Sequence, residues 1–267
     1  MDLYNFLMAA LLGVVEGVTE FLPISSTGHL ILVEDLLNFK GPPGQLFEIV
    51  IQLGAILSVV WIYRVKLWNT ALGLFHPGPE QRLTINVLLA FLPAAVVGVL
   101  AHDFIKAVLF SPWVVCVSLI VGGIAILLIE RLQKDHHITK VEDISAGRAL
   151  AVGAFQCLAM IPGVSRAAAT IMGALLMGVS RPAAAEFSFL LAIPTMFGAT
   201  FYDLYKNRHT LSADGIEIIA VGFVVSFIVA LVVVKWLLRY ISGHGFGAFA
   251  VYRIILGVVM IAVLLMR

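Results

Sequence analysis

Residues 3–33 read LYNFLMAALLGVVEGVTEFLPISSTGHLILV, an apolar run that is interrupted near its middle. The interruption extends from Phe21 to His29 and contains a proline, two serines, a threonine and a glycine. A helix needs roughly 20 apolar residues to cross the hydrocarbon core of a bilayer, so each half of this run is too short. The pattern therefore predicts two half-helices that enter the membrane and return on the same side.

A second apolar region, residues 149–179, is broken in the same way by the sequence IPGVSR at positions 161–166. Each broken region is followed by three apolar segments that we predict to cross the membrane. These segments are residues 46–63, 83–101 and 107–129 after the first region, and residues 187–202, 218–234 and 249–266 after the second. The predicted fold is an all-α polytopic membrane protein with six spans and two re-entrant helix–loop–helix hairpins.

The composition supports a membrane protein. Hydrophobic residues make up 61% of the chain and charged residues only 12%, against roughly 25% charged in soluble domains. The mean hydropathy is +1.04. The net charge of +1 gives no indication of a nucleic-acid partner. Cys116 and Cys157 lie in apolar runs without the spacing of a metal site, and we interpret both as packing residues.

The order of elements indicates an internal repeat within one integral membrane domain. A hairpin and three spans occupy residues 1–131, a basic cytoplasmic linker covers 132–147, and the same series returns in 148–267. The matched segments are Gly13–Glu16 with Gly153–Gln156 and Pro23–Ser26 with Pro162–Ser165. Three crossings per half make the second copy inverted, and in such folds the site lies near the bilayer midplane where the interruptions meet.

Basic residues indicate the orientation, because cytoplasmic connections carry an excess of Lys and Arg. The basic connections contain Arg64, Lys66 and Arg82; Arg131, Lys134, Lys140 and Arg148; and Lys235 and Arg239. We expect these connections in the cytoplasm and the others outside. Lys206 and Arg208 fall in an outward connection, so the bias has an exception.

Two carboxylates precede the first interruption. Glu16 and Glu20 are four residues apart and share one helix face. Inserting an ionised carboxylate at the bilayer centre costs about 2.5–3.5 kcal/mol on insertion scales, so this pair needs an interaction that compensates for the cost. Protonation or a wet vestibule would supply one, whereas a divalent cation held by both carboxylates would make the pair functional.

The interruption itself supplies nucleophiles and a base. Ser25, Ser26 and Thr27 carry hydroxyl groups, and His29 is the usual type of proton acceptor near neutral pH. Such a run before a helix is also typical of an N-cap, which is the structural alternative.

Arg166 places a guanidinium inside the second interruption. Its fork suits phosphate oxygens, and Gly163, Ser165 and the following helix offer backbone N–H groups to an anion. An ion pair with Glu16 or Glu20 is the alternative. Together the two interruptions provide what phosphoryl transfer requires, and a substrate whose tail stays in lipid would be a polyisoprenyl or glycerolipid phosphate.

The residues EGVTEFLPISSTGH at 16–29, PGVSR at 162–166 and EFSF at 186–189 resemble the bacterial undecaprenyl-diphosphate phosphatase family, also called the bacitracin-resistance protein family. The resemblance covers nearly the whole chain. It implies a multi-pass enzyme of the bacterial inner membrane, with its site open to the periplasm, that removes the terminal phosphate of undecaprenyl diphosphate. It also implies a divalent cation, Mg²⁺ or Ca²⁺.

The site residues expected from the residues and the resemblance fall into three groups. Catalytic roles go to Glu20, Ser26, His29 and Arg166; phosphate binding to Ser25, Thr27, Ser165, Arg166 and Thr170; and metal binding to Glu16 and Glu20. Ser26 would attack phosphorus with help from His29, or water would attack directly. Where the family usually reads Ser-Arg-Ser-Gly-x-Thr, this chain has alanines at 167–169, and an altered backbone is expected there because Ala avoids positive φ.

Other interpretations stay open. Inverted repeats with broken helices are also typical of transporters, so an ion-coupled transporter or a flippase of a lipid-linked or small anionic substrate is the main alternative. A type 2 phosphatidic acid phosphatase is disfavoured because its motifs are missing. His76, His136 and His137 are not expected to bind metal. For partners, the sequence favours a polyprenyl diphosphate lipid and the bilayer, and leaves a homodimer open.

Overall fold

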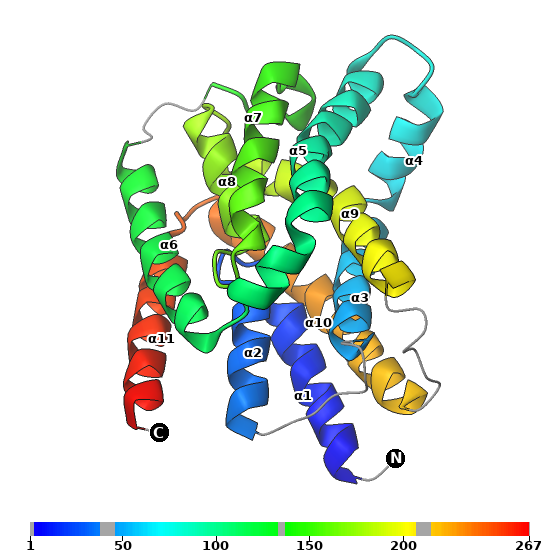
Figure 1. Ribbon diagram of the computed structural model, residues 1–267. Helices are drawn as coiled ribbons and strands as arrows, with labels where there is room; N and C mark the ends of the chain where they lie inside the picture. Colours follow the sequence, from blue (N-terminus) through cyan, green and yellow to red (C-terminus); the bar gives the residue numbers. More distant parts are fainter. Residues whose placement is uncertain (1–2, 38–45, 133–136, 207–214, 267) are drawn as a thin grey trace.

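The computed structural model describes residues 3–37, 46–132, 137–206 and 215–266, and the regular structure of these residues is helical, without any strand. A single isolated bridge joins Ile138 to Val179. The helices, shown in Figure 1, are α1 Leu3–Thr19, α2 Ser26–Leu37, α3 Leu46–Ile62, α4 Arg64–Gly73, α5 Pro79–Val108, α6 Pro112–Leu132, η2 Val141–Asp143, α7 Ala146–Gln156, η3 Cys157–Met160, α8 Arg166–Leu176, α9 Arg181–Lys206, α10 Ile216–Ile241 and α11 Gly247–Met266. The predicted all-α class is confirmed.

Five of the described helices are long and apolar enough to cross a membrane, namely α5, α6, α9, α10 and α11. A sixth span results if α3 and α4, which are bent by 72° at their junction, are counted together. The six predicted segments therefore all coincide with helices, but one boundary was wrong. Residues 107–108 end α5, and α6 begins only at Pro112, because proline is favoured in the first turn of a helix.

The two broken regions form helix pairs whose turns lie inside the molecule. In Figure 1, α1 and α2 occupy the lower part and turn upward into the middle, while α7 and α8 occupy the upper part and turn downward toward it. The first break is shorter than predicted: residues 20–25 are non-helical, and residues 26–29 already belong to α2. The second break, residues 161–165, ends one residue before its predicted limit, because Arg166 begins α8.

Close helix contacts hold the first pair in place. A Cβ atom added to Gly17 would lie 2.7 Å from the carbonyl oxygen of Ser226, so α1 and α10 approach closely only because residue 17 has no side chain. A Cβ on Gly54 would lie 2.6 Å from the carbonyl oxygen of Phe223, which gives α3 the same close packing on α10. Small residues at helix contacts are the usual means of tight packing in membranes.

The basic linker packs against the rest of the chain where it is described. The backbone N–H of Ser180 donates to the carbonyl of Ile138 at 2.8 Å. Lys66 on α4 forms ion pairs with Glu142 of the linker, at 2.6 Å, and with Glu186 of α9, at 2.7 Å. The linker is thus fastened to both halves of the molecule.

Candidate active site

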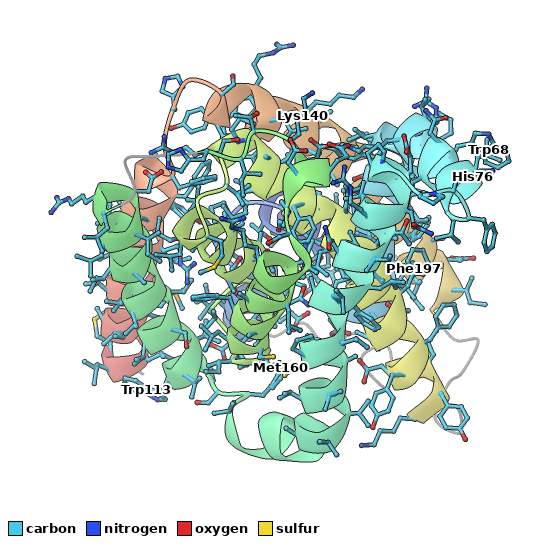
Figure 2. All side chains as sticks on the ribbon, turned by 90° about the horizontal axis from the view of Figure 1, so that it is seen from above. Trp68, His76, Trp113, Lys140, Met160 and Phe197 are labelled. Carbon is cyan, nitrogen blue, oxygen red and sulfur yellow. The ribbon has the colours of Figure 1, made fainter. Side chains whose placement is uncertain are left out.

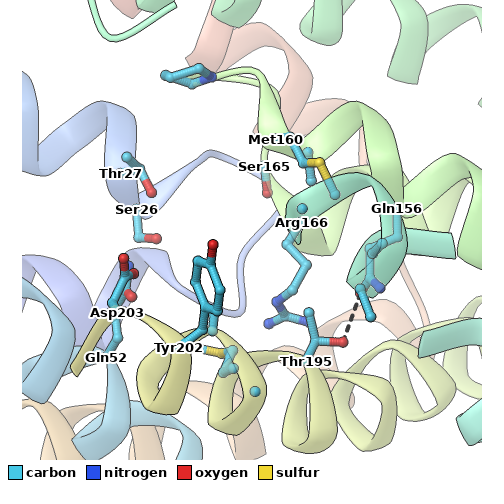
Figure 3. Close-up of a pocket in the computed structure, with 18 of the residues that line it drawn as sticks. Ser26, Thr27, Gln52, Gln156, Met160, Ser165, Arg166, Thr195, Tyr202 and Asp203 are labelled. Carbon is cyan, nitrogen blue, oxygen red and sulfur yellow. Dashed lines mark hydrogen bonds between the residues drawn. The ribbon is translucent and has the colours of Figure 1, made fainter. Parts of the chain in front are cut away.

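A pocket of about 480 Å³ lies where the two breaks meet. The first break contributes Glu20, Ser25, Ser26 and Thr27, and the second contributes Pro162, Gly163, Ser165 and Arg166. Figure 3 shows Ser26 and Thr27 facing the pocket opposite Ser165 and Arg166. The remaining wall is mostly apolar and comes largely from α5 and α9. The prediction that the two interruptions meet is confirmed.

Neighbouring serines in the first break have different partners. Ser25 has a positive φ of 73°, and its Oγ accepts a hydrogen bond from the backbone N–H of Gly28 at 3.3 Å. Ser25 is therefore the N-cap of α2. Ser26 Oγ instead donates a short hydrogen bond to Glu20 Oε2. The hydroxyl of Ser26 thus faces a carboxylate that can accept its proton.

The second break repeats this geometry. Ser165 has a φ of 78°, and its Oγ accepts from the backbone N–H of Ala168 at 3.2 Å, which makes it the N-cap of α8. Ser25 and Ser165 correspond in conformation, whereas the sequence match pairs Ser26 with Ser165, so that match is displaced by one residue. The separation along the chain between Ser25 and Ser165 equals the separation between Glu16 and Gln156. Both α2 and α8 begin at the pocket, where their N-terminal N–H groups favour an anion.

Arg166 joins the two breaks. Its Nη2 lies 3.2 Å from Glu20 Oε1, and its Nη1 donates to the backbone carbonyl of Ser188 at 3.1 Å. The guanidinium carbon is 5.9 Å from the ring centre of Phe21. The ion pair considered as an alternative does exist with Glu20, and it leaves the guanidinium on the pocket wall.

Glu16 is fully buried and does not line the pocket. Glu16 lies one helical turn before Glu20, whose backbone N–H donates to the carbonyl of Glu16 at 2.9 Å, so the two carboxyl groups are near neighbours. Among the described residues, neither oxygen of Glu16 has a hydrogen-bond donor. Two neighbouring carboxylates repel each other, and besides the Arg166 charge beside Glu20 a shared proton or a cation would stabilise the pair.

His29 is turned away from Ser26. Since a carbonyl only accepts, its Nδ1–H donates to the backbone oxygen of Ser25 at 2.7 Å, and in the neutral ring Nε2 then accepts from Tyr252 at 2.8 Å. The two rings stack with centres 5.6 Å apart. The structure does not bring His29 to the pocket wall, and it places Glu20, not His29, against the Ser26 hydroxyl.

Thr170 also lies behind the pocket. Its hydroxyl is fully buried, 2.6 Å from Ser188 Oγ and 2.9 Å from the carbonyl oxygen of Arg166. The neighbouring alanines are helical residues of α8, and the positive φ values of this break fall on Gly163 and Ser165. Positive φ, which alanine avoids, is therefore not needed at Ala167 and Ala168 of this chain, and an altered backbone relative to the family stays a prediction.

Sequence reasoning missed Arg253 of α11. This residue is fully buried and donates to the backbone carbonyls of Pro23 at 3.1 Å, Gly163 at 2.9 Å and Ser118 at 3.2 Å. One guanidinium thus binds both breaks and α6. The sequence did contain a signal, because Arg253 is a charged residue inside an apolar span. An ionisable residue at membrane depth suggests a functional site.

The other histidines named above lie elsewhere. His76 is exposed at the edge of the molecule, as is Trp68 (Figure 2), and the side chain of His137 is exposed in the linker. His136 lies outside the described residues. Cys116 is buried in an apolar cluster and Cys157 is half-buried, both as free thiols.

The helices and the pocket define a multi-pass membrane protein with a central pocket where Arg166 and the starts of α2 and α8 meet. Residues 9–259 match the family model described as "Bacitracin resistance protein BacA". The chain therefore belongs to the BacA bacitracin resistance family, and the resemblance predicted from the sequence is confirmed.

Similar proteins cover the chain almost completely. Undecaprenyl-diphosphatase 2 of Paramagnetospirillum magneticum is 56% identical over 98% of this chain and 100% of its own length. The undecaprenyl-diphosphatase of Nitrosospira multiformis is 54% identical over 98% of this chain and 96% of its own length. That of Pseudomonas fluorescens is 52% identical over 98% of this chain and 95% of its own length.

Proposed function

We propose that this protein hydrolyses undecaprenyl diphosphate to undecaprenyl phosphate and inorganic phosphate, which recycles the lipid carrier for cell-wall synthesis and confers bacitracin resistance. The names of its relatives support this activity. The observation that carries it is the continuous contact from Ser26 through Glu20 to Arg166 on the pocket wall. A pure transport site has no need of a hydroxyl paired with a carboxylate.

The pocket residues account for each part of the reaction. Arg166 and the N–H groups at the starts of α2 and α8 bind the diphosphate oxygens. Glu20 takes the proton of Ser26 as its Oγ bonds to the terminal phosphorus, and the bond from that phosphorus to the bridging oxygen breaks. The lipid monophosphate leaves, and water then hydrolyses the phosphoserine. Trapping phosphorylated Ser26 during turnover would exclude direct attack by water.

The apolar wall suits the lipid tail. The apolar side chains of Phe91, Val99, Phe110 and Met196 line the pocket together with its polar groups. An isoprenoid chain is pure hydrocarbon, so its burial against these side chains is favourable.

A divalent cation fits the carboxylate pair. Glu16 and Glu20 would hold it, because Mg²⁺ is commonly bound by one or two carboxylates together with substrate phosphates. The undonated oxygens of Glu16 are consistent with such a ligand. When bound, the cation would neutralise charge on the transferring phosphoryl group. In the described part of the chain, no group of three or more His, Cys, Asp or Glu side chains offers another site.

We further propose that the two helix pairs are re-entrant hairpins of an inverted repeat in the bacterial inner membrane. The pocket wall includes Tyr202 and Asp203 near the end of α9, whereas the linker and α4 carry the basic residues expected in the cytoplasm (Figure 1). The pocket would then open to the periplasm. A homodimer remains a prediction.

The direct test is phosphate release from undecaprenyl diphosphate by the purified protein in detergent. We expect release to stop with a chelator, and to fall by a factor of about 10²–10⁴ in Glu20→Ala and in Arg166→Ala. Asp143→Asn, an exposed substitution on η2 at a residue that does not line the pocket, is the control and should retain activity. Folded protein that releases no phosphate with metals supplied would overturn the proposal in favour of transport.

A further inference from the structure

Gln156, the last residue of α7, lines the pocket although its side chain takes no part in the reaction described above. The residue is 2% exposed. Its Oε1 accepts a hydrogen bond at 3.3 Å from Thr195 Oγ1 of α9, a hydroxyl that also donates to the carbonyl of Leu191 at 2.8 Å. Among the described residues, its Nε2 has no hydrogen-bond partner.

A buried amide N–H without an acceptor is unfavourable, because the group has lost its water and gained nothing in return. An amide nitrogen can only donate. A ligand that removes this cost must therefore present an acceptor oxygen, and a cation cannot do so. The phosphate groups of the proposed substrate carry such oxygens.

The place of Gln156 in the chain supports this interpretation. Gln156 matches Glu16 in the sequence, and the corresponding caps Ser25 and Ser165 follow them at the same spacing. At this matched position, one half of the molecule has a hydrogen-bond acceptor, the carboxylate of Glu16. The other half has a donor, the amide Nε2 of Gln156. Figure 3 shows Arg166 between Ser26 and Thr27 on one side and Gln156 with Thr195 on the other.

We infer that Nε2 of Gln156 donates to the lipid-linked phosphate of the bound diphosphate and so helps to select diphosphate lipids. This inference rests on the proposed function. Ser26 must contact the terminal phosphorus, so a donor on the far side of Arg166 meets the phosphate that departs with the lipid. Thr195 acts through Gln156 as a positioning residue.

The test compares inhibition by the two products. Inorganic phosphate occupies the terminal position and undecaprenyl phosphate occupies the other. In Gln156→Leu we expect the KM for undecaprenyl diphosphate and the inhibition constant of undecaprenyl phosphate to rise about 10- to 100-fold, the range for a hydrogen bond to a charged group. The inhibition constant of inorganic phosphate should stay unchanged. Gln156→Glu should have a larger effect, because it places a carboxylate beside the anion.

Asn86→Leu is the matched control. Asn86 is also a buried amide, 3% exposed, but its Nδ2 donates to the carbonyl of Ile144 at 2.6 Å and it does not line the pocket. Its loss should lower thermal stability and leave KM and both inhibition constants unchanged.

Thr195→Val keeps the inference testable if Gln156→Leu does not fold. It removes the hydroxyl that donates to Gln156 Oε1 and to the carbonyl of Leu191, and we expect a smaller shift, about two- to fivefold, in the same two constants. Unchanged constants, or an equal rise for both products, would overturn the inference. If the wild type released no phosphate, the proposed function would fail separately. Stabilisation of each variant by undecaprenyl phosphate in thermal unfolding would still decide the role of Gln156.

Discussion

Ser25 and Ser26 are adjacent in the chain and have separate tasks in the first break. Ser25 adopts a positive φ and caps α2, which leaves Ser26 to face Glu20. A non-glycine residue at positive φ costs free energy, of order 1–3 kcal/mol, and such strain persists only where surrounding contacts fix it. Here His29 and Tyr252 supply those contacts, because Nδ1 of His29 holds the carbonyl of Ser25.

This arrangement predicts that His29 positions the break and does not take the proton of Ser26. His29→Ala should lower kcat about 10- to 100-fold through misplacement of the reacting groups, and the surviving activity should keep the wild-type pH profile between about pH 5 and pH 8, where histidine titrates. Tyr252→Phe, which removes one hydroxyl, should cause a smaller loss with the same profile. If the fall in activity at low pH were absent from the pH profile of His29→Ala, His29 would instead be identified as the base.

At the scale of elements, α11 completes the site without lining it. Tyr252 and Arg253 are consecutive, and they bind the first break through His29 and through the carbonyl of Pro23. Arg253 also reaches Gly163 and Ser118, so it fixes the two breaks against α6. Room for the guanidinium comes from Gly122 on α6, where an added Cβ would meet the side chain of Arg253.

Gly122→Ala should therefore displace Arg253 and loosen both breaks. We expect a loss of about 1–3 kcal/mol in stability, the range for overpacking, together with reduced turnover, measured by thermal unfolding and phosphate release. Gly147→Ala is the matched control, because nothing lies within 4 Å of a Cβ at that position in α7. This control should be neutral or stabilising by up to about 1 kcal/mol. Equal behaviour of the two variants would contradict the role of Arg253.

The elements were predictable to different degrees. Apolar runs of sufficient length, and breaks rich in Pro, Gly and Ser, indicated nearly every helix. The partners of His29 were not predictable, since Tyr252 is 223 residues away and no local pattern links them. The start of α2 was placed too late, because the capping role of Ser25 depends on a φ angle that the sequence does not reveal.

At the scale of the whole molecule, Lys66 fastens the linker to both halves. Its ammonium pairs with Glu142 and with Glu186, which belong to the linker and to α9. The linker lies outside the membrane-spanning helices. Partial burial there raises the pKa of Glu142, but the hydrogen bond and the charge of Lys66 outweigh this, so the pKa lies below its usual value.

A lowered pKa in the folded state stabilises the protein above the unfolded pKa of about 4.3, and this stabilisation is lost as the pH falls through the folded value. Glu142→Gln should lower stability by about 0.2–1 kcal/mol at pH 7, since the pair is partly exposed, and the difference from wild type should shrink on acidification below about pH 4.3. Thermal unfolding across pH measures this. Asp143→Asn, exposed on the same short helix, should show no such change.

The proposed orientation is tested by thiol labelling in a background with Cys116→Ala and Cys157→Ser. Trp68 on α4 and Tyr205 near the end of α9 are both about two-thirds exposed, at 66% and 67%, and lie beside connections that the proposed orientation places on opposite sides of the membrane. An impermeant maleimide should label Tyr205→Cys in intact spheroplasts and Trp68→Cys only after permeabilisation. The reverse pattern would show that the pocket opens to the cytoplasm.

The family and the multi-pass fold followed from the sequence, because motif and hydropathy are local properties. The contact between Glu20 and Arg166 could be offered only as an alternative, since 146 residues separate them and several partners were compatible with the charges. Arg253 was overlooked because no second charged residue accompanies it in its span to suggest a site.

The hydrogen bonds by which Arg253 joins the two breaks also have a consequence for biosynthesis. Its partner Pro23 precedes it by 230 residues. At chain elongation rates of about 5–20 residues per second, the first break is in the membrane for roughly 10–50 s before that guanidinium is translated. During this interval the carbonyl of Pro23 depends on water or on insertion machinery. Assembly of the pocket is therefore among the last events of synthesis, and a chain stalled before α11 would contain both helix pairs without the arginine that joins them.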